Sequence, residues 1–476
     1  MEQKKVSIVH YIITAVIAFG FGLLPPFGAM TEYGMGLLGT FIGAVYGWST
    51  IGMIWPSFIA LTAMGYYMGM AKMLAASIGN PVVAGLLIIF PMFAVLSELH
   101  VTEWLANKFI TNKLSLGRPW VAIGMIFLGA YLTSFINSIL VIIIFGTFVC
   151  TLCKNLNIAP YSKFATAMMI GVAYAVMLGQ IAVPMLGTGL TFSLAFQGMF
   201  QTAMPYAKFM AFMYPVGITL LLIYIAVMKF VLRVDVSPLK NLTIEMLGED
   251  AGKLNADQKK AAGFFLLFTV IILASSLVPA QSAAGVFLNK FGFFGIGAII
   301  ASIMMLVPMS DGRPCLDYVK SAGHIAWDPF WLTAYIMVVS TYLTGADTGL
   351  SATIAMVLQN FTHMSPWIFI IGVLVFAAVI TNVANNLILT IVIMPLLFQF
   401  AGMVGMNGIG LVLVLFLTTQ LALATPGASP ITAIAMSNVS HVKVLDMMKM
   451  SFIVIPIMLF FSIVLGMAWS AVIFPM

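Results

Sequence analysis

TSFINSIL, at residues 133–140, sets hydroxyl and amide side chains in the middle of a long uncharged apolar run. A hydroxyl or amide left unpaired in hydrocarbon costs several kcal/mol, so these side chains are expected to pack against protein or to face a water-filled cavity. TNVANNLI, at 381–388, repeats the pattern: a Thr, three residues, an Asn, then a small polar residue and two aliphatic ones. The two stretches predict a pair of equivalent polar sites inside a membrane protein.

The composition of the whole chain is that of a membrane protein with several spans. Of 476 residues, 62% are apolar and 7% are charged, and the mean hydropathy is +1.12, whereas soluble domains carry about 25% charged residues. Residues 1–26 have a basic start, but no small-residue cleavage site follows their apolar stretch. We interpret them as a first span rather than as a removed signal peptide. The net charge of +6 is explained by topology and not by a nucleic-acid partner.

The apolar segments predict about 11 membrane crossings, at roughly 20 residues each. Two of the longest segments, 119–151 and 366–400, are interpreted as re-entrant hairpins, and two others, 164–200 and 410–438, as discontinuous helices. With the N-terminus in the cytoplasm, this arrangement places most Lys and Arg residues inside, as the positive-inside rule requires. The apolar segments lie near 7–24, 35–48, 51–70, 81–98, 119–151, 164–200, 209–231, 262–279, 284–307, 330–345, 366–400, 410–438 and 450–474.

The two halves of the chain repeat each other on either side of a polar linker at 234–261, which the topology places in the cytoplasm. Besides the two stretches quoted above, GQIAVPMLGTG at 179–189 pairs with TQLALATPGAS at 419–429, and 46–69 pairs with 323–345. An odd number of crossings between equivalent elements makes the repeats inverted. Inverted repeats with helices interrupted at matching positions are typical of secondary transporters whose site lies near the bilayer midplane.

The interruptions supply binding groups without charged side chains. Gly and Pro residues at 187–189 and 424–427 break the helices and leave half-helix ends, of which the positive ends attract anions and the exposed carbonyls suit small cations. Close helix packing through small residues is the other interpretation of any single cluster. No Ser-His-Asp set, His/Cys cluster or phosphate loop occurs within the spans, so we do not expect an enzyme. A channel would not need two discontinuous inverted hairpins.

At these residues the chain resembles the divalent anion:sodium symporter family, within the wider ion transporter superfamily, over nearly its full length. The leading Ser of each family tip motif is replaced here, by Ile136 and Ala384, and the Pro-Pro-Asn endings of the family loops are absent. The matching positions are the GW…WP stretch at 46–56, the segment 326–345, the Ser-Asn-Thr tips at 136–138 and 384–386, and the Gly-Thr and Ala-Thr-Pro loops at 187–191 and 424–428.

The resemblance implies a homodimeric elevator made of two parts. A scaffold part would hold the dimer, and a transport part with both hairpins and both broken helices would carry solute and Na⁺ across the membrane. The scaffold part would comprise 1–118 and 262–365, and the transport part 119–233 and 366–476, with the linker 234–261 between the halves.

The resemblance also implies the site residues. In the family, the Asn and Thr side chains of the tips touch a substrate carboxylate, while carbonyl oxygens of the tips and broken helices hold Na⁺. The substrate-binding residues implied by position are Asn137, Ser138, Thr188, Asn385, Asn386, Thr425 and Pro426. The Na⁺ ligands implied by position, mainly through backbone oxygens, are Thr133, Asn137, Gly187, Thr381, Asn385 and Ala424.

The function expected is secondary active transport of small organic or inorganic anions of the di- or tricarboxylate type, and not enzyme catalysis. Na⁺ is the expected coupling ion, and no other cofactor is expected. The expected partners are the anionic solute, Na⁺, the lipid bilayer of the cell inner (plasma) membrane and a second copy of the chain. Because both tips have lost a Ser hydroxyl, a Na⁺-independent exchanger or a proton-coupled permease of the same superfamily is the alternative.

Overall fold

The computed structural model describes residues 7–243, 246, 252–279, 281–323, 327–343, 345–359, 361, 364–437 and 441–475. Over these residues the chain is helical, without strands, and shows an isolated β-bridge between Pro308 and Pro314. The predicted all-α fold is therefore confirmed. Parts of two sequence features lie outside the described residues: positions 244–245 and 247–251 of the linker, and positions 324–326 and 344 of the segment that opens the second half.

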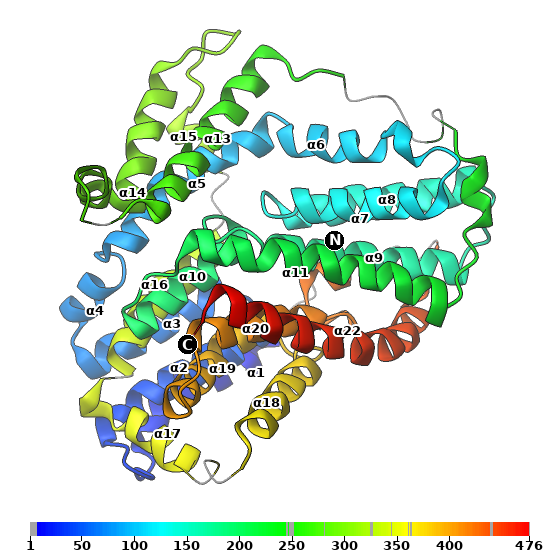
Figure 1. The fold of residues 1–476 in the computed structure, drawn as a ribbon. Coiled ribbons are helices and arrows are strands. Elements are labelled where there is room, and N and C mark those ends of the chain that lie inside the picture. Colours follow the sequence, from blue (N-terminus) through cyan, green and yellow to red (C-terminus); the bar gives the residue numbers. More distant parts are fainter. Residues whose placement is uncertain are drawn as a thin grey trace.

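The helices follow the chain as shown in Figure 1. Those of the first half are α1 (Ile8–Gly20), α2 (Glu32–Thr50), α3 (Ile54–Met68), α4 (Met70–Ala76), α5 (Pro81–Glu98), α6 (Val101–Ile110), α7 (Pro119–Thr133), α8 (Ser138–Asn155), α9 (Lys163–Gln180), α10 (Gly187–Phe200) and α11 (Tyr206–Ala226). Those of the second half are α13 (Ala256–Leu277), α14 (Ala283–Leu306), α15 (Tyr318–Ala322), α16 (Trp327–Leu343), α17 (Leu350–Gln359), α18 (Pro366–Ile380), α19 (Asn386–Met403), α20 (Gly408–Thr418), α21 (Pro430–Met436) and α22 (Val444–Ile473). Short 3₁₀ or π turns are η1 (Phe21–Leu23), η2 (Lys113–Ser115), η3 (Val227–Val231), η4 (Ser237–Asn241), η5 (Ala346–Thr348) and η6 (Thr419–Leu421).

Six of the described helices are long and apolar enough to cross a membrane, or seven if the bent pair of α5 and α6 counts as one span. These two helices meet at 50°, where His100 adopts a left-handed conformation with φ of +56°. Several other apolar helices, among them α7, α18 and α20, are shorter than a plain crossing. The number of crossings, about 11, and the inverted relation of the halves stay predictions.

The two segments expected to be hairpins form helix–turn–helix units that begin with the same signals. α7 and α18 each start with a Pro in the first turn, where its missing N–H needs no partner. α8 and α19 each start after an N-cap Asn, Asn137 and Asn385. The turns between the paired helices are residues 134–137 and 381–385. Each unit thus carries its polar stretch at the tip.

The segments expected to be broken helices are interrupted where the sequence has Gly and Pro. α9 ends at Gln180 and α10 begins at Gly187, while η6 extends α20 to Leu421 and α21 begins at Pro430. Gly187 has φ of +49°, a backbone conformation that glycine adopts without steric cost and that a side chain would strain. The break after α9 therefore depends on a glycine at this position.

The two long arms of the broken helices, α9 and α20, lie at the centre of the hydrophobic core. Of the residues of α9, 94% are buried inside the protein, and α20 is buried from Gly410 to Thr418. α9 packs on α7, α8 and α22, and α20 packs on α18, α19 and α22. Two stacked ring pairs join the halves: Phe192 with Phe416, and Phe200 with Phe398, at centroid distances of 4.0 and 3.8 Å. Hairpins and broken helices of both halves therefore share one core.

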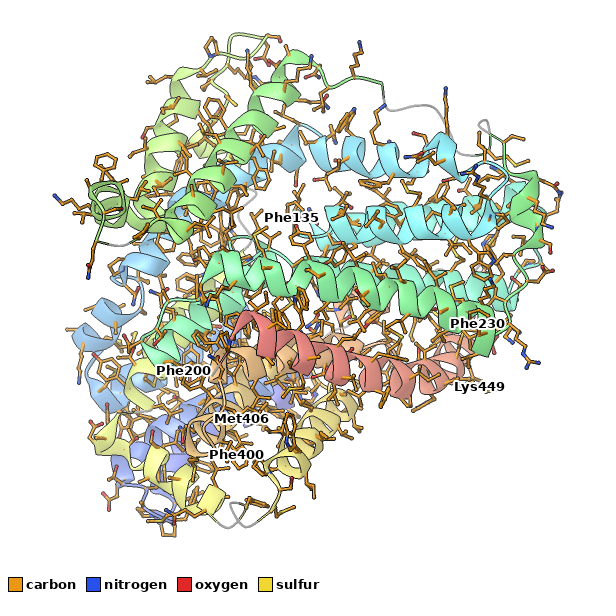
Figure 2. The ribbon with its side chains drawn as sticks, in the orientation of Figure 1. Phe135, Phe200, Phe230, Phe400, Met406 and Lys449 are labelled. Atoms are coloured by element: carbon orange, nitrogen blue, oxygen red, sulfur yellow. The ribbon has the colours of Figure 1, made fainter. Side chains whose placement is uncertain are left out.

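The labelled side chains of Figure 2 mark the two ends of this core. Phe230, after α11, and Lys449, in the first turns of α22, lie at one end, whereas Phe200 and Met406 lie toward the other end. Phe135, in the first hairpin tip, lies between them. The predicted topology places the regions of Lys449 and Met406 on opposite sides of the membrane, and this stays a prediction.

Candidate solute-binding site

An Asn caps the second helix of each hairpin, and the cap fixes the orientation of its amide. Asn137 Oδ1 accepts a hydrogen bond from the backbone N–H of Leu140 at 3.0 Å. Asn385 Oδ1 accepts from the N–H groups of Leu387 and Ile388 at 3.0 and 3.2 Å. Because a backbone N–H can bond only to the oxygen of an amide, the NH₂ group of each Asn is left for another acceptor. The two hairpin tips thus present equivalent hydrogen-bond donors.

Two adjoining cavities lie between the hairpin tips and the breaks of the helices. The first, of about 250 Å³, is lined by 134–138 of the first tip, including Asn137. The second, of about 310 Å³, is lined by Asn385 and Asn386 of the second tip. Predicted site residues of both halves therefore border the same region. The residues that line both cavities are Ser138, Gln180, Gly187, Thr188 and Pro329.

Four helix N-termini open onto these cavities. α8 begins at Ser138, α10 at Gly187, α19 at Asn386 and α21 at Pro430, and each of these residues lines at least one cavity. The first turn of a helix has N–H groups without intrahelical partners and carries about half a positive charge. Each such end stabilises a nearby anion by about 0.3–2 kcal/mol. The arrangement therefore suits a small anion.

The lining of the two cavities has almost no charged side chains. Among the described residues that line them, Asp328 of α16 is the one charged residue, and none is basic. No group of three or more His, Cys, Asp or Glu side chains able to hold a metal ion occurs among the described residues. The oxygens offered here belong to amides, hydroxyls and carbonyls, which are ligands that hard cations such as Na⁺ accept.

A hydrogen-bonded chain of side chains runs from one half of the protein to the other beside the cavities. The Thr188 hydroxyl donates to Gln180 Oε1 at 3.2 Å. Gln180 Nε2 donates to Gln420 Oε1 at 3.4 Å, and Asn386 Nδ2 donates to the same oxygen at 2.9 Å. The sequence paired Gln180 and Gln420 as equivalents of the repeat but did not assign them to the site. The sequence does contain a pattern that could have indicated their role. Each Gln stands in the shared Gln-aliphatic-Ala-aliphatic pattern just before a helix break.

Two of the residues expected to hold Na⁺ are buried next to the tips and do not line either cavity. The Thr133 hydroxyl donates to the carbonyl of Gly129 at 2.8 Å, and the Thr381 hydroxyl donates to the carbonyl of Thr419 at 2.9 Å. Both hydroxyls therefore bond to neighbouring backbone. A role for either residue through its own carbonyl oxygen stays a prediction.

The loop of the second broken helix also lies outside the lining at the positions expected to bind solute or Na⁺. The Thr425 hydroxyl donates to the carbonyl of Asn382, and Asn382 Oδ1 accepts from the N–H of Ala424 at 2.8 Å. Pro426 is exposed. These bonds attach the loop to the second hairpin tip, and the second cavity is lined instead by Ser429 and by residues just after it. The solute and Na⁺ roles of Thr425, Pro426 and Ala424 stay predictions.

The chain is similar to known transporters in sequence and in fold. No family model matches the chain. Its sequence is similar to "Sodium-dependent high-affinity dicarboxylate transporter 3" of Caenorhabditis elegans, with 22% identity over 312 residues. That match covers 60% of this chain and 54%, about half, of the relative.

Two solved transporter structures are similar to this fold. The YdaH transporter of Alcanivorax borkumensis matches with a TM-score of 0.57 at 11% identity, over 86% of this chain and 90% of that one. MtrF of Neisseria gonorrhoeae, described as one of a class of antimetabolite efflux pumps, matches with a TM-score of 0.50 at 14% identity, over 85% and 84%. The chain has a transporter fold. The resemblance expected from the hairpin tips is thus confirmed as a resemblance to transporters, and this transporter fold belongs to a multi-pass membrane protein.

Proposed function

We propose that this protein is a secondary active transporter of small anions of the di- or tricarboxylate class, with Na⁺ as the coupling ion. The observation that carries the proposal is that four helix N-termini and the two capping residues Asn137 and Asn385 line cavities that have no basic side chain among their described lining residues. A dicarboxylate has a group of acceptor oxygens at each end, which suits one donor from each hairpin tip. The name of the similar C. elegans protein favours the same solute class.

The charge balance of this site supports the proposed sodium coupling. Helix N-termini contribute about 0.3–2 kcal/mol each, whereas removing an ion from water costs several kcal/mol per charge. A cation bound about 4 Å from the solute would add roughly 4 kcal/mol of attraction at the effective dielectric of a partly exposed site. The neutral oxygens around the cavities suit Na⁺ for this role. The carbonyls of Thr133, Asn137, Gly187, Thr381, Asn385 and Ala424 are the proposed ligands.

The proposed mechanism is an elevator movement of the hairpins and broken helices against the remaining helices. The hairpins and broken helices of both halves share one hydrophobic core, and the movement would have to break the contacts of this core with α2, α3 and α16. The scaffold segments 1–118 and 262–365 would then carry the interface of a homodimer, because a moving part cannot also be fixed to its neighbour. We place the protein in the plasma membrane with its N-terminus in the cytoplasm, in keeping with the distribution of Lys and Arg.

Proton coupling is a second candidate, and Asp328 is the observation that favours it. Asp328 lines the second cavity, where an ionised carboxylate would repel a bound anion. A proton bound there would remove that repulsion, as Na⁺ would do by adding charge. Asp328→Asn separates the two mechanisms, because proton-coupled uptake would lose its dependence on a pH gradient in this variant, whereas Na⁺-coupled uptake would keep its dependence on Na⁺.

Counterflow tests whether the protein is a carrier. Proteoliposomes are loaded with unlabelled succinate and diluted into a trace of labelled succinate, with citrate and sulfate as further probes and protein-free liposomes as the control. A carrier accumulates the label transiently above its outside concentration, because outward-moving sites are occupied by unlabelled solute. Entry that only reaches equilibrium would indicate a channel, and chemical conversion of the label would indicate an enzyme.

A further inference from the structure

The two buried Gln side chains beside the cavities have their orientations fixed by bonds to groups that can only accept or only donate. Gln420 Nε2 donates to the carbonyl of Phe416 at 3.0 Å. Gln420 Oε1 must therefore face the other way, where Asn386 and Gln180 both donate to it. Gln180 uses its Nε2 in this bond and turns its Oε1 to the Thr188 hydroxyl. The donor and the acceptor of each hydrogen bond from Asn386 to Thr188 are thus determined.

This series of hydrogen bonds determines which donors and acceptors two cavity-lining residues present to a solute. The hydroxyl proton of Thr188 is used by Gln180, so Thr188 presents only acceptor lone pairs to the cavities. Asn386 gives one amide hydrogen to Gln420, and its Oδ1 accepts from the N–H of Leu387 at 3.0 Å, which leaves one amide hydrogen. A Gln in each half therefore sets the hydrogen-bonding character of a lining residue in its own half, and the bond between the two Gln side chains joins the halves.

The geometry points to Gln180 and Gln420 as positioning residues that set solute selectivity and couple the break of the first broken helix to the second hairpin tip. Gln420 lines neither cavity and acts through Asn386, whereas Gln180 lines both cavities and also orients the hydroxyl of Thr188. Gln420 is fully buried and Gln180 is 7% exposed, so bulk water does not replace a hydrogen bond that either loses when a partner is removed. The inference rests on the proposed function for the nature of the solute, but the coupling itself does not depend on it.

Amide hydrogen exchange of the detergent-purified protein tests the coupling without a solute. Gln420→Met keeps the length of the side chain and removes its hydrogen bonds. We expect exchange about threefold faster or more, not only at 386–390 in the second half but also at 187–190 in the first. The matched control is Gln197→Met, a half-buried position of α10 that lines neither cavity. Faster exchange confined to the second half would overturn the coupling.

A double-mutant cycle on uptake tests the positioning role. We expect Gln420→Met to raise the KM for labelled succinate about five- to tenfold, the effect of one or two lost hydrogen bonds, with little change in kcat. If Gln420 acts through Asn386, the double variant with Asn386→Ala has the KM of Asn386→Ala alone within about twofold. Effects that multiply, in a wild type that transports, would overturn the positioning role. Failure of the wild type to take up any of the three probes would instead contradict the proposed function.

Discussion

At the scale of single residues, each tip Asn performs two tasks that can be separated by substitution. Ser caps a helix about as well as Asn but has no NH₂ group. Asn137→Ser and Asn385→Ser should therefore keep the melting temperature and lower uptake tenfold or more, since a hydrogen bond to a charged group contributes about 1.5–3 kcal/mol. Asn137→Ala should lose both uptake and about 1 kcal/mol of helix stabilisation. Thermal unfolding and proteoliposome uptake measure the two effects.

Asn407 provides the matched control for these variants. It caps α20 by accepting from the N–H groups of Ile409 and Gly410 at 3.1 and 3.2 Å, but it lines neither cavity. Asn407→Ser should leave uptake unchanged. Normal uptake by both tip variants would mean that the Asn residues serve only as helix caps.

The tip residues could be predicted from the sequence and the buried Gln pair could not, for a physical reason. Asn137 and Asn385 stand in uncharged apolar runs, where an amide needs a partner, so the pattern alone marks them. The roles of Gln180 and Gln420 depend on a bond between positions 240 residues apart. Repeat symmetry identified the pair, but only the packing of α9 against η6 shows that the two side chains meet.

At the scale of elements, the hairpin and the broken helix of the first half pack closely against each other at Gly179. A Cβ added to Gly179 on α9 would lie 2.1 Å from the carbonyl oxygen of Tyr131 on α7. Gly179→Ala should therefore lower the melting temperature and uptake, because the backbone of α7 would have to shift. Gly372 on α18 has no atom within 4 Å of the same added group, and Gly372→Ala should be neutral or slightly stabilising, by up to about 1 kcal/mol. Equal melting temperatures for the two variants would contradict this packing.

The helix starts and breaks were the most predictable elements. The bounds of the apolar runs and the break-forming Gly and Pro are local signals, and the predicted segments match the outer ends of α7–α10 and α18–α21 within a few residues. The bend between α5 and α6 and the separate helix α17 were not expected. Both depend on backbone turns, at His100 and at Gly349 with φ of +73°, and hydropathy does not detect turns.

At the scale of the whole molecule, the predicted topology places the two ends of the core on opposite sides of the membrane. In a chain with Cys150, Cys153 and Cys315 replaced by Ser, single cysteines at Lys154 and Lys253 should react with an impermeant reagent only from the cytoplasm. A single cysteine at Met403, which is 43% exposed and spares the cap of α20, should react only from outside. Labelling of positions 154 and 403 from the same side would contradict the inverted arrangement of the hairpins.

Accumulation of labelled succinate in proteoliposomes under an inward Na⁺ gradient, with choline replacing Na⁺ in the parallel sample, tests the proposed Na⁺ coupling. The site has no basic side chain among its described lining residues, so we assign the missing positive charge to a bound cation. We predict accumulation above equilibrium with Na⁺, little uptake with choline, and loss of both the rate and the accumulation in Asn137→Ser. Equal rates of uptake in Na⁺ and in choline by the wild type would contradict Na⁺ coupling and leave exchange or proton coupling as the mechanism.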